Sequence, residues 1–259
     1  MAHRACCTLL ALALLHSSVD GLQLIDLSYE GGVVFGREES VTTFATLATS
    51  VNVTSAFTIC SSISSVSSAT VMSLFQLLGA GGGPWLVVWL ERLEAGDQLT
   101  LMMDGREGGL TYPNHSLVRR PLGHFWSHGC LSVSTATGRL VLVWDGQVVE
   151  DRSFQEVVAT EGEVVGDLQG RLVLGKMNRG FWYQCSQRVT NMHIWGRELA
   201  VEDMVGVTGV RCGEQEGALA AWPTLEWELH GEAEVAVVHM EEVCEMENKL
   251  IVLTTSMSR

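Results

Sequence analysis

Proline and basic residues are scarce in this sequence of 259 residues. It has four prolines, and Lys and Arg together number 16 against 30 Asp and Glu, which gives a net charge of −14. Such an excess of negative charge repels phosphate backbones and anionic lipid headgroups, so nucleic acid and bare membrane are poor partners. No repeat, low-complexity tract or proline-rich linker divides the chain. The sequence therefore predicts one large domain.

A run of apolar residues long enough to cross a membrane is also missing. Crossing takes about 20 apolar residues, and the run Ala5–Leu15 is shorter. Arg4 precedes this run and small residues follow it, which is the pattern of a secretory signal peptide. We therefore expect residues 1–21 to be removed, no membrane insertion, and a secreted, extracellular protein.

Closely spaced cysteine pairs such as the C-x-x-C of zinc sites are absent as well. Of the seven cysteines, two lie in the expected signal peptide and five remain. In an oxidising compartment a cysteine most often forms a disulfide. Cys185, Cys212 and Cys244 can supply one pair and one odd thiol, and the sequence does not choose among the three pairings.

Short apolar segments with β-branched residues and polar or glycine boundaries dominate the rest of the chain, which is typical of β-strands. A two-residue hairpin turn is expected at Asp145-Gly146. One stretch, Arg197–Val207, has helical spacing. Many short strands with one short helix predict an all-β, two-sheet antiparallel sandwich. The clearest strand segments are 56–63, 84–90, 98–103, 129–134, 139–144, 171–175 and 189–195.

The alternation within two of these segments bears on the cysteines. Cys60 shares one face of its strand with Thr58 and Ser62, and Cys130 shares one face with Ser132 and Ser134. Small neighbours leave room for a second sulfur. If the two strands are adjacent, a Cys60–Cys130 disulfide is sterically reasonable. Closing a loop of this length would stabilise the fold by about 4 kcal/mol.

The ordered motifs of the chain resemble those of the pentraxin family over about residues 22–232, which leaves residues 233–259 as a C-terminal extension. The family signature is matched by His128, Cys130, Ser132 and Thr135, with Val133 in the position of its tryptophan. Segments such as LVWDGQVV and VTNMHIWGRELAVEDM follow in the family's order. The resemblance implies a jelly-roll sandwich of the concanavalin A type, a disulfide matching Cys60–Cys130, and ring-shaped homo-oligomers. It also implies two bound calcium ions that hold phosphocholine or other ligands.

The sequence departs from the family at the calcium ligands. An Asp-Asn pair of the family falls on Gly82-Gly83, a later acidic cluster falls on residues 177–179, and no Asp or Glu occurs between Gln169 and Trp195. In this region only Asn178 and Gln184 keep an oxygen donor. Calcium prefers six to eight oxygen ligands, several of them carboxylates. We therefore expect neither the family's calcium site nor another metal or cofactor.

Cations and aromatic residues stand where those acids are lost. One interpretation is a metal-free site in which guanidinium groups hold an anion and aromatic rings stack on a sugar or choline-like group. The other is that the aromatic rings fill the space left by the ions and the cations are solvated, which is the commoner role of aromatic side chains. The residues concerned are Lys176, Arg179, Phe181, Trp182, Tyr183 and Arg188.

Other motifs predict modification rather than catalysis. Asn52 and Asn114 begin N-glycosylation sequons. Glycoside hydrolysis needs two carboxylates about a cleft, and the one candidate pair on a strand face is Glu226 and Glu228. No Ser-His-Asp arrangement is evident, and His128 is interpreted as a satisfied, partly buried imidazole beside the disulfide.

We therefore expect a secreted glycoprotein that is not an enzyme. As the resemblance implies, it would serve innate recognition, binding a surface glycan, a phosphate-bearing ligand or a protein on microbial or cell surfaces. The alternative is an adhesion or receptor-ectodomain module that contacts proteins, and a glycan-active hydrolase ranks below both.

Overall fold

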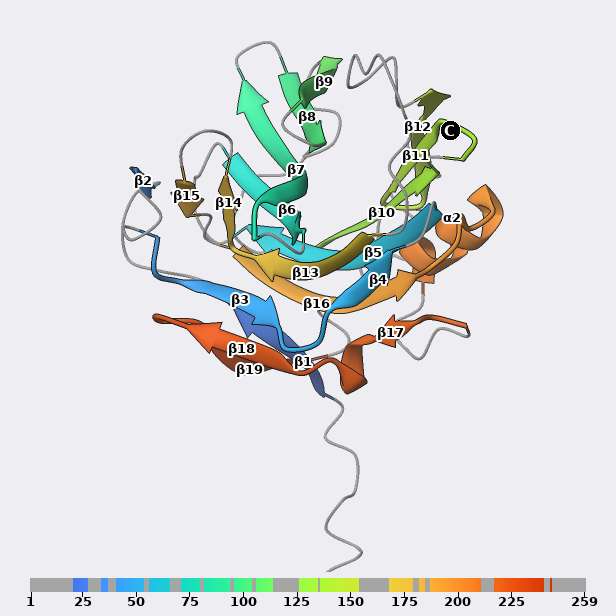
Figure 1. Ribbon diagram of the computed structural model, residues 1–259. Helices are drawn as coiled ribbons and strands as arrows, with labels where there is room; N and C mark the ends of the chain where they lie inside the picture. Colours follow the sequence, from blue (N-terminus) through green and yellow to red (C-terminus); the bar gives the residue numbers. More distant parts are fainter. Residues whose placement is uncertain are drawn as a thin grey trace, which may run out of the picture.

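Two antiparallel β-sheets stack face to face in the computed structural model (Figure 1). The structure describes residues 21–27, 34–36, 41–53, 56–65, 71–79, 82–93, 96–103, 106–113, 126–134, 136–153, 168–178, 182–184, 187–210, 217–239 and 243. The predicted two-sheet sandwich with one short helix is confirmed for this part of the chain. The helix is α2 (Val201–Val210), and a single 3₁₀ turn, η2, covers Trp222–Thr224.

The first sheet contains the cysteine strands at its centre. Its order is β12 (Gln147–Ser153), β11 (Arg139–Trp144), β10 (Ser127–Ser134), β5 (Ala56–Ser65), β16 (Gln187–Trp195), β1 (Gly21–Asp26) and β19 (Glu234–His239), and β17 (Ala220–Ala221) also pairs with β16. The first and last described strands, β1 and β19, are therefore neighbours. Part of the segment expected to form a C-terminal extension, residues 233–259, is a strand of this sheet.

The second sheet faces the first across the core. Its order is β18 (Trp227–His230), β3 (Phe44–Leu47), β13 (Leu168–Leu174), β6 (Val71–Leu78), β7 (Pro84–Leu93), β8 (Gly96–Met103) and β9 (Arg106–Pro113), and β4 (Val51–Val53) also pairs with β13. A small third sheet consists of β14 (Lys176–Asn178), β15 (Trp182–Gln184) and β2 (Val34–Gly36).

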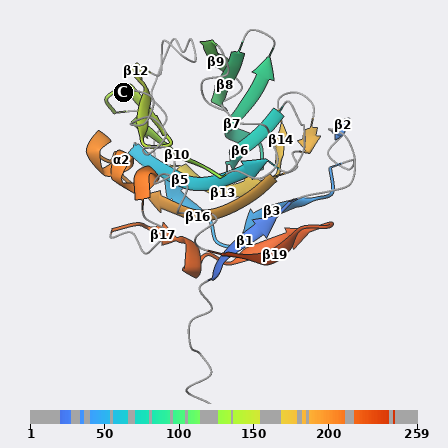
Figure 2. The ribbon, with the colours of Figure 1, turned by 180° about the vertical axis from the view of Figure 1, so that it is seen from behind.

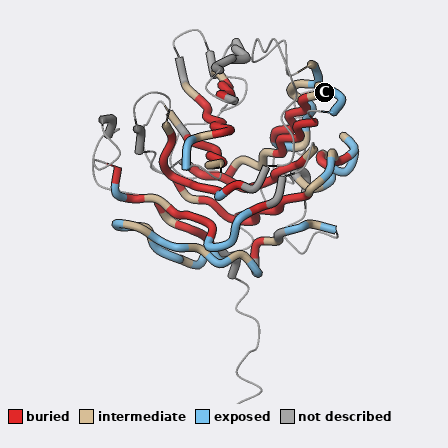
Figure 3. Tube along the Cα trace, in the orientation of Figure 1, coloured by how far each residue is buried: buried red, intermediate tan, exposed pale blue. Residues whose placement is uncertain are grey.

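Alternating apolar residues of both sheets form the core. Side chains on successive residues of a strand point to opposite faces, so Phe57 and Ile59 of β5 face the second sheet while Thr58 and Cys60 face away. Figure 3 shows the buried residues concentrated between the two sheets. Burial of such surface contributes about 25 cal/mol per Å². Further core residues are Leu86, Val88, Leu90, Leu99, Leu101, Leu131, Val133, Leu140, Leu142, Trp144, Leu172, Leu174 and Ile194.

Gly129 of β10 leaves space in the core for the indole of Trp144. Gly129 lies opposite Trp144 of β11. A Cβ atom added to Gly129 would lie 2.6 Å from Cζ3 of the Trp144 ring, closer than carbon atoms approach. The absence of a side chain at this position therefore leaves room for the Trp144 indole against the strand.

The predicted hairpin turn between β11 and β12 is confirmed. Asp145 and Gly146 both have positive φ, 46° and 75°. These values match a turn whose twist follows that of the flanking strands.

The predicted disulfide is also confirmed. Cys130 lies directly opposite Cys60 in the pairing of β10 with β5, and the two are joined. The disulfide lies on the outer face of the first sheet, where α2 covers it: Met204 and Leu199 pack with Val141, Val143 and Trp195 around it. Views from the front and from behind both show α2 beside this end of the sheet (Figures 1 and 2).

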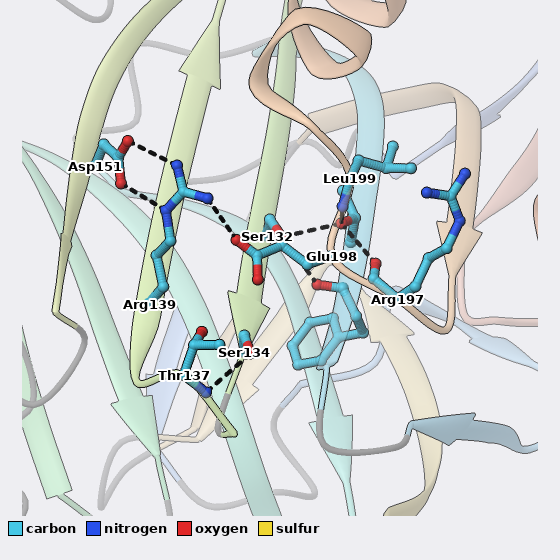
Figure 4. A network of polar contacts seen from close by, with 10 residues as sticks. Ser132, Ser134, Thr137, Arg139, Asp151, Arg197, Glu198 and Leu199 are labelled. Atoms are coloured by element: carbon cyan, nitrogen blue, oxygen red, sulfur yellow. Dashed lines mark hydrogen bonds and ion pairs between the residues drawn. The ribbon is translucent and has the colours of Figure 1, made fainter.

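The helix begins at Val201, four residues later than the expected start at Arg197. The hydroxyl of Thr58 explains the difference, because it donates to the carbonyl oxygen of Arg197 at 3.0 Å and accepts the N–H of Leu199 at 3.1 Å. These bonds hold residues 197–199 against β5 in a non-helical conformation. Figure 4 shows this network beside a second one, in which Arg139 pairs with Asp151 and Glu198.

Candidate functional site

A fold-back of the chain after β13 covers the outer face of the second sheet. Gly175, at the end of β13, has a φ of +82°, a conformation that favours glycine. The chain then runs back over β6: the hydroxyl of Ser73 lies 3.5 Å from the carbonyl oxygen of Lys176, and the N–H of Asn178 donates to Oε1 of Gln76 at 2.8 Å. Strand β14 is thus held over the sheet by polar side chains of β6.

Met177, at the centre of β14, is fully buried in an apolar cluster. It packs with Val87 and Trp89 of β7 and with Met102 of β8. Resemblance to the pentraxins places an acidic calcium ligand at this position. A thioether is a soft group that suits apolar packing, whereas calcium prefers oxygen.

Gly82 and Gly83, which stand where the family has an Asp-Asn pair, lie in a turn that is closed by backbone hydrogen bonds. Gly79 N–H donates to the carbonyl of Gly83 at 2.9 Å, and Gly82 N–H donates to the carbonyl of Gly79 at 2.8 Å. Gly82 has a φ of +78°. Within the ranges that the structure describes, no group of three or more His, Cys, Asp or Glu side chains lies close enough together to hold a metal ion.

Lys176, the first of the predicted ligand-binding cations, is buried rather than solvated. Its Nζ lies 3.5 Å from the centre of the Phe44 ring, a cation–π contact. The Phe44 ring in turn stacks on the imidazole of His230, with centroids 4.1 Å apart and an interplanar angle of 17°. The ammonium group, the phenyl ring and the imidazole thus connect β14, β3 and β18.

The structure brings some predicted site residues together and separates others. In the small sheet Asn178 lies opposite Trp182 and Met177 lies opposite Tyr183, so both aromatic residues belong to the strand beside β14. Arg188 instead lies in β16 of the first sheet, where its Nε donates to Oδ2 of Asp26 at 2.8 Å. Arg179 and Phe181 lie outside the described residues.

Two buried polar side chains of the second sheet were missed by sequence reasoning. Gln76 and Thr100 lie on the outer face of the second sheet, and within the described part of the chain Nε2 of Gln76 and Oγ1 of Thr100 have no hydrogen-bond partner. Unpaired buried polar atoms are uncommon and costly. A signal was present, since each residue interrupts an apolar strand, SLFQLL or QLTLMM.

His128 confirms the interpretation of a satisfied imidazole near the disulfide. Its Nδ1 lies 2.7 Å from Oγ of Ser62, and its Nε2 lies 3.0 Å from the carbonyl oxygen of Val243. Burial lowers the pKa of His128, while the charge of Asp145 and the Val243 hydrogen bond act in the opposite direction. The ring is therefore neutral at pH 7.

Three further sequence candidates lie on described strands or next to them. Asn52 is in β4 opposite Gln169. Glu226 precedes β18 and Glu228 lies within it, both exposed. Asn114, Cys185, Cys212 and Cys244 lie outside the described residues. No helix within the described ranges is long and apolar enough to span a membrane.

Comparisons with known proteins match the fold and not the sequence. No protein-family model matches the chain, and no curated protein does either. The heptameric SAP-like pentraxin of Limulus polyphemus superposes with a TM-score of 0.66 at 14% identity, over 86% of this chain and 99% of that one. The full extracellular region of zebrafish Gpr126/Adgrg6 gives 0.58 at 13% identity, over 83% of this chain and 26% of that one.

A Bacteroides ovatus protein with a suggested carbohydrate-binding role gives a TM-score of 0.51 at 10% identity, over 77% of this chain and 59% of that one. At these identities the comparisons establish the architecture alone. The chain has the jelly-roll sandwich that is found in pentraxins and in other extracellular and ligand-binding domains.

Proposed function

We propose that this protein is a secreted recognition module related to the pentraxins, which binds ligands without catalysis and without the calcium ions of that family. The match to the SAP-like pentraxin over nearly its whole length supports the relation. A sandwich of this kind hosts many functions, so the site has to carry the functional argument.

The observation that carries the proposal is the burial of Met177 among Val87, Trp89 and Met102. At the position where the family resemblance puts an acidic ligand, an apolar side chain fills the space. Calcium would need this segment to supply oxygen atoms, and binding would require β14 to leave its apolar cluster. The ligand is therefore expected to meet a metal-free surface at the small sheet, where Trp182 and Tyr183 lie beside β14.

Calcium calorimetry on the purified protein tests the metal dependence, and binding to immobilised phosphocholine and glycans with and without EDTA tests recognition. We expect calorimetry to record no heat of calcium binding. We expect binding to the resin to persist in EDTA and to weaken in the Trp182→Ala variant. The matched control is Leu219→Ala, because Leu219 is 61% exposed and its N–H is bonded to Ile194 in β16 of the first sheet, not to the small sheet. Binding abolished by EDTA would contradict the proposal, and so would retention on no resin at all.

A receptor-ectodomain module that contacts proteins is the second candidate. The match to the extracellular region of Gpr126/Adgrg6 favours it, although that protein is about four times as long as the matched part. Retention on a panel of cell-surface ectodomains, with none on glycan or phosphocholine resin, would favour this candidate. Hydrolysis of polysaccharides is expected to be absent, and any activity lost in Glu226→Gln would contradict a non-catalytic role.

A further inference from the structure

Among the strands that the structure describes, β19 is the edge of the first sheet, and apolar side chains are exposed along it. Its one partner among these strands is β1. Val235 is 52% exposed and Val237 is 61% exposed, although Val235 lies opposite Ile25, a core residue of β1. Leu229 of β18, the edge strand of the second sheet, is 37% exposed and lies opposite the buried Ala45. The two edge strands thus carry exposed apolar side chains beside a core that is itself covered, since Ile25 and Ala45 are almost fully buried.

Proteins ordinarily protect such an edge with Lys, Pro, charges or a β-bulge, because its unpaired N–H and C=O groups can pair with another chain. Strand β12, the opposite edge of the same sheet, has this protection: its pairing with β11 contains a register shift at Leu142/Val143, and it carries Glu150, Asp151 and Arg152. Strand β19 has the sequence EVAVVH and pairs with β1 over six residues without a shift. Its edge is therefore fit for strand addition.

The charges around this edge are acidic. Residues 217–239 contain no Lys or Arg, and the four glutamates of β18, β19 and the segments next to them are all exposed: Glu226, Glu228, Glu232 and Glu234. The net charge of the chain is −14. A second copy of the chain would bring like charges together, which costs free energy. A cationic partner would be attracted instead.

We propose that the β19 edge binds an extended protein segment in which basic and apolar residues alternate. The segment adds as a strand beside β19, its apolar side chains cover Val235, Val237 and Leu229, and its basic side chains approach the glutamates. Main-chain hydrogen bonds supply affinity in this mode, and alternate side chains supply selectivity. This binding surface uses strands other than those of the small sheet, so it does not depend on the function proposed above.

The test uses a synthetic peptide of about ten residues in which Lys and Val alternate, a length typical of strands. Calorimetry measures binding, and hydrogen exchange locates it. We expect protection of the amides of residues 234–239, and affinity that falls as salt screens the charges. Val237→Lys is expected to weaken binding about tenfold, because it removes apolar contact and adds a like charge. Val148→Lys, at a 48% exposed valine on the protected edge strand β12, is expected to leave binding unchanged.

Four results would overturn the proposal. The first is equal binding of a peptide in which Glu and Val alternate, because the charge argument would then fail. The second is equal binding to the Val237→Lys variant, and the third is no binding at millimolar peptide. The fourth is concentration-dependent self-association that Val237→Lys abolishes, because the occupant of the edge would then be a second copy. Circular dichroism and thermal melting are used to check that the variants are folded. We expect them to be, because Val237 is exposed.

Discussion

The imidazole of His128 is hydrogen-bonded to the carbonyl oxygen of Val243, 3.0 Å away and 115 residues further along the chain. A carbonyl oxygen can only accept, so Nε2 of His128 carries the hydrogen, and Nδ1 of the neutral ring accepts from the hydroxyl of Ser62. Val243, which follows β19 in the sequence, is thereby tied to β10 of the first sheet. Val243 is fully buried beside Leu24 and Trp126.

The stability of the protein is expected to fall on mild acidification because of His128. Burial lowers its pKa in the folded state below about 6.5, the ordinary value for histidine. Between the two values the unfolded chain binds a proton that the folded chain does not, so the free energy of unfolding decreases as pH falls below about 6.5. Urea denaturation at several pH values checks this. In His128→Gln, whose amide can still donate to Val243, the decrease should be smaller, and an unchanged pH dependence would assign it to other groups.

Gly129→Ala is expected to destabilise the core. The new methyl group would collide with the Trp144 ring, and overpacking of this kind typically costs about 1–3 kcal/mol. Gly83→Ala is the control, because nothing lies within 4 Å of an added Cβ there. Chemical denaturation of the two variants should separate them clearly. Equal stability would mean that Trp144 can move at little cost.

Thr58→Val removes the hydroxyl that satisfies Arg197 and Leu199. The Leu199 N–H is buried, and leaving such a group unpaired costs about 1–3 kcal/mol. Faster hydrogen exchange at the start of α2 is expected as well. Ser134→Ala serves as the control, since its hydroxyl accepts a single 3.3 Å bond from Thr137. If both variants behave alike, Thr58 does not determine where the helix begins.

The disulfide is expected to resist reduction in the native state, because both sulfurs lie under α2 and are almost fully buried. Its loop spans 70 residues, so the Cys60→Ala/Cys130→Ala variant should lose about 4 kcal/mol on the loop-entropy model. Peptide mapping without reduction should recover the Cys60–Cys130 pair. Recovery of other pairings would contradict the assignment of this disulfide.

The strands, the hairpin and the disulfide could be predicted from the sequence because their signals are local. Alternation in RLVLVW and the Asp145-Gly146 pair each specify structure within a few residues. To predict the Cys60–Cys130 disulfide, it was then enough to assume that the two strands are adjacent.

The candidate site was less predictable because its contacts are distant in sequence. Arg188 was expected to serve a ligand, but it pairs with Asp26, 162 residues away. The burial of Met177 depends on Gln76 and Ser73, which hold β14 in place. Strand β14 has three residues. This is too short for a hydrophobic pattern to indicate that the chain folds back over the second sheet.

The pairing of β1 with β19 has a consequence for how the chain acquires its structure. Strand β1 lies between β16 and β19, so two of the three strands at this side of the first sheet come from opposite ends of the described chain. Contacts of such high sequence separation form slowly. During synthesis the sheet can be completed only after residue 239 has left the ribosome, and until then β1 presents an uncovered edge. Chaperone binding to nascent chains should accordingly persist until nearly the whole domain has emerged.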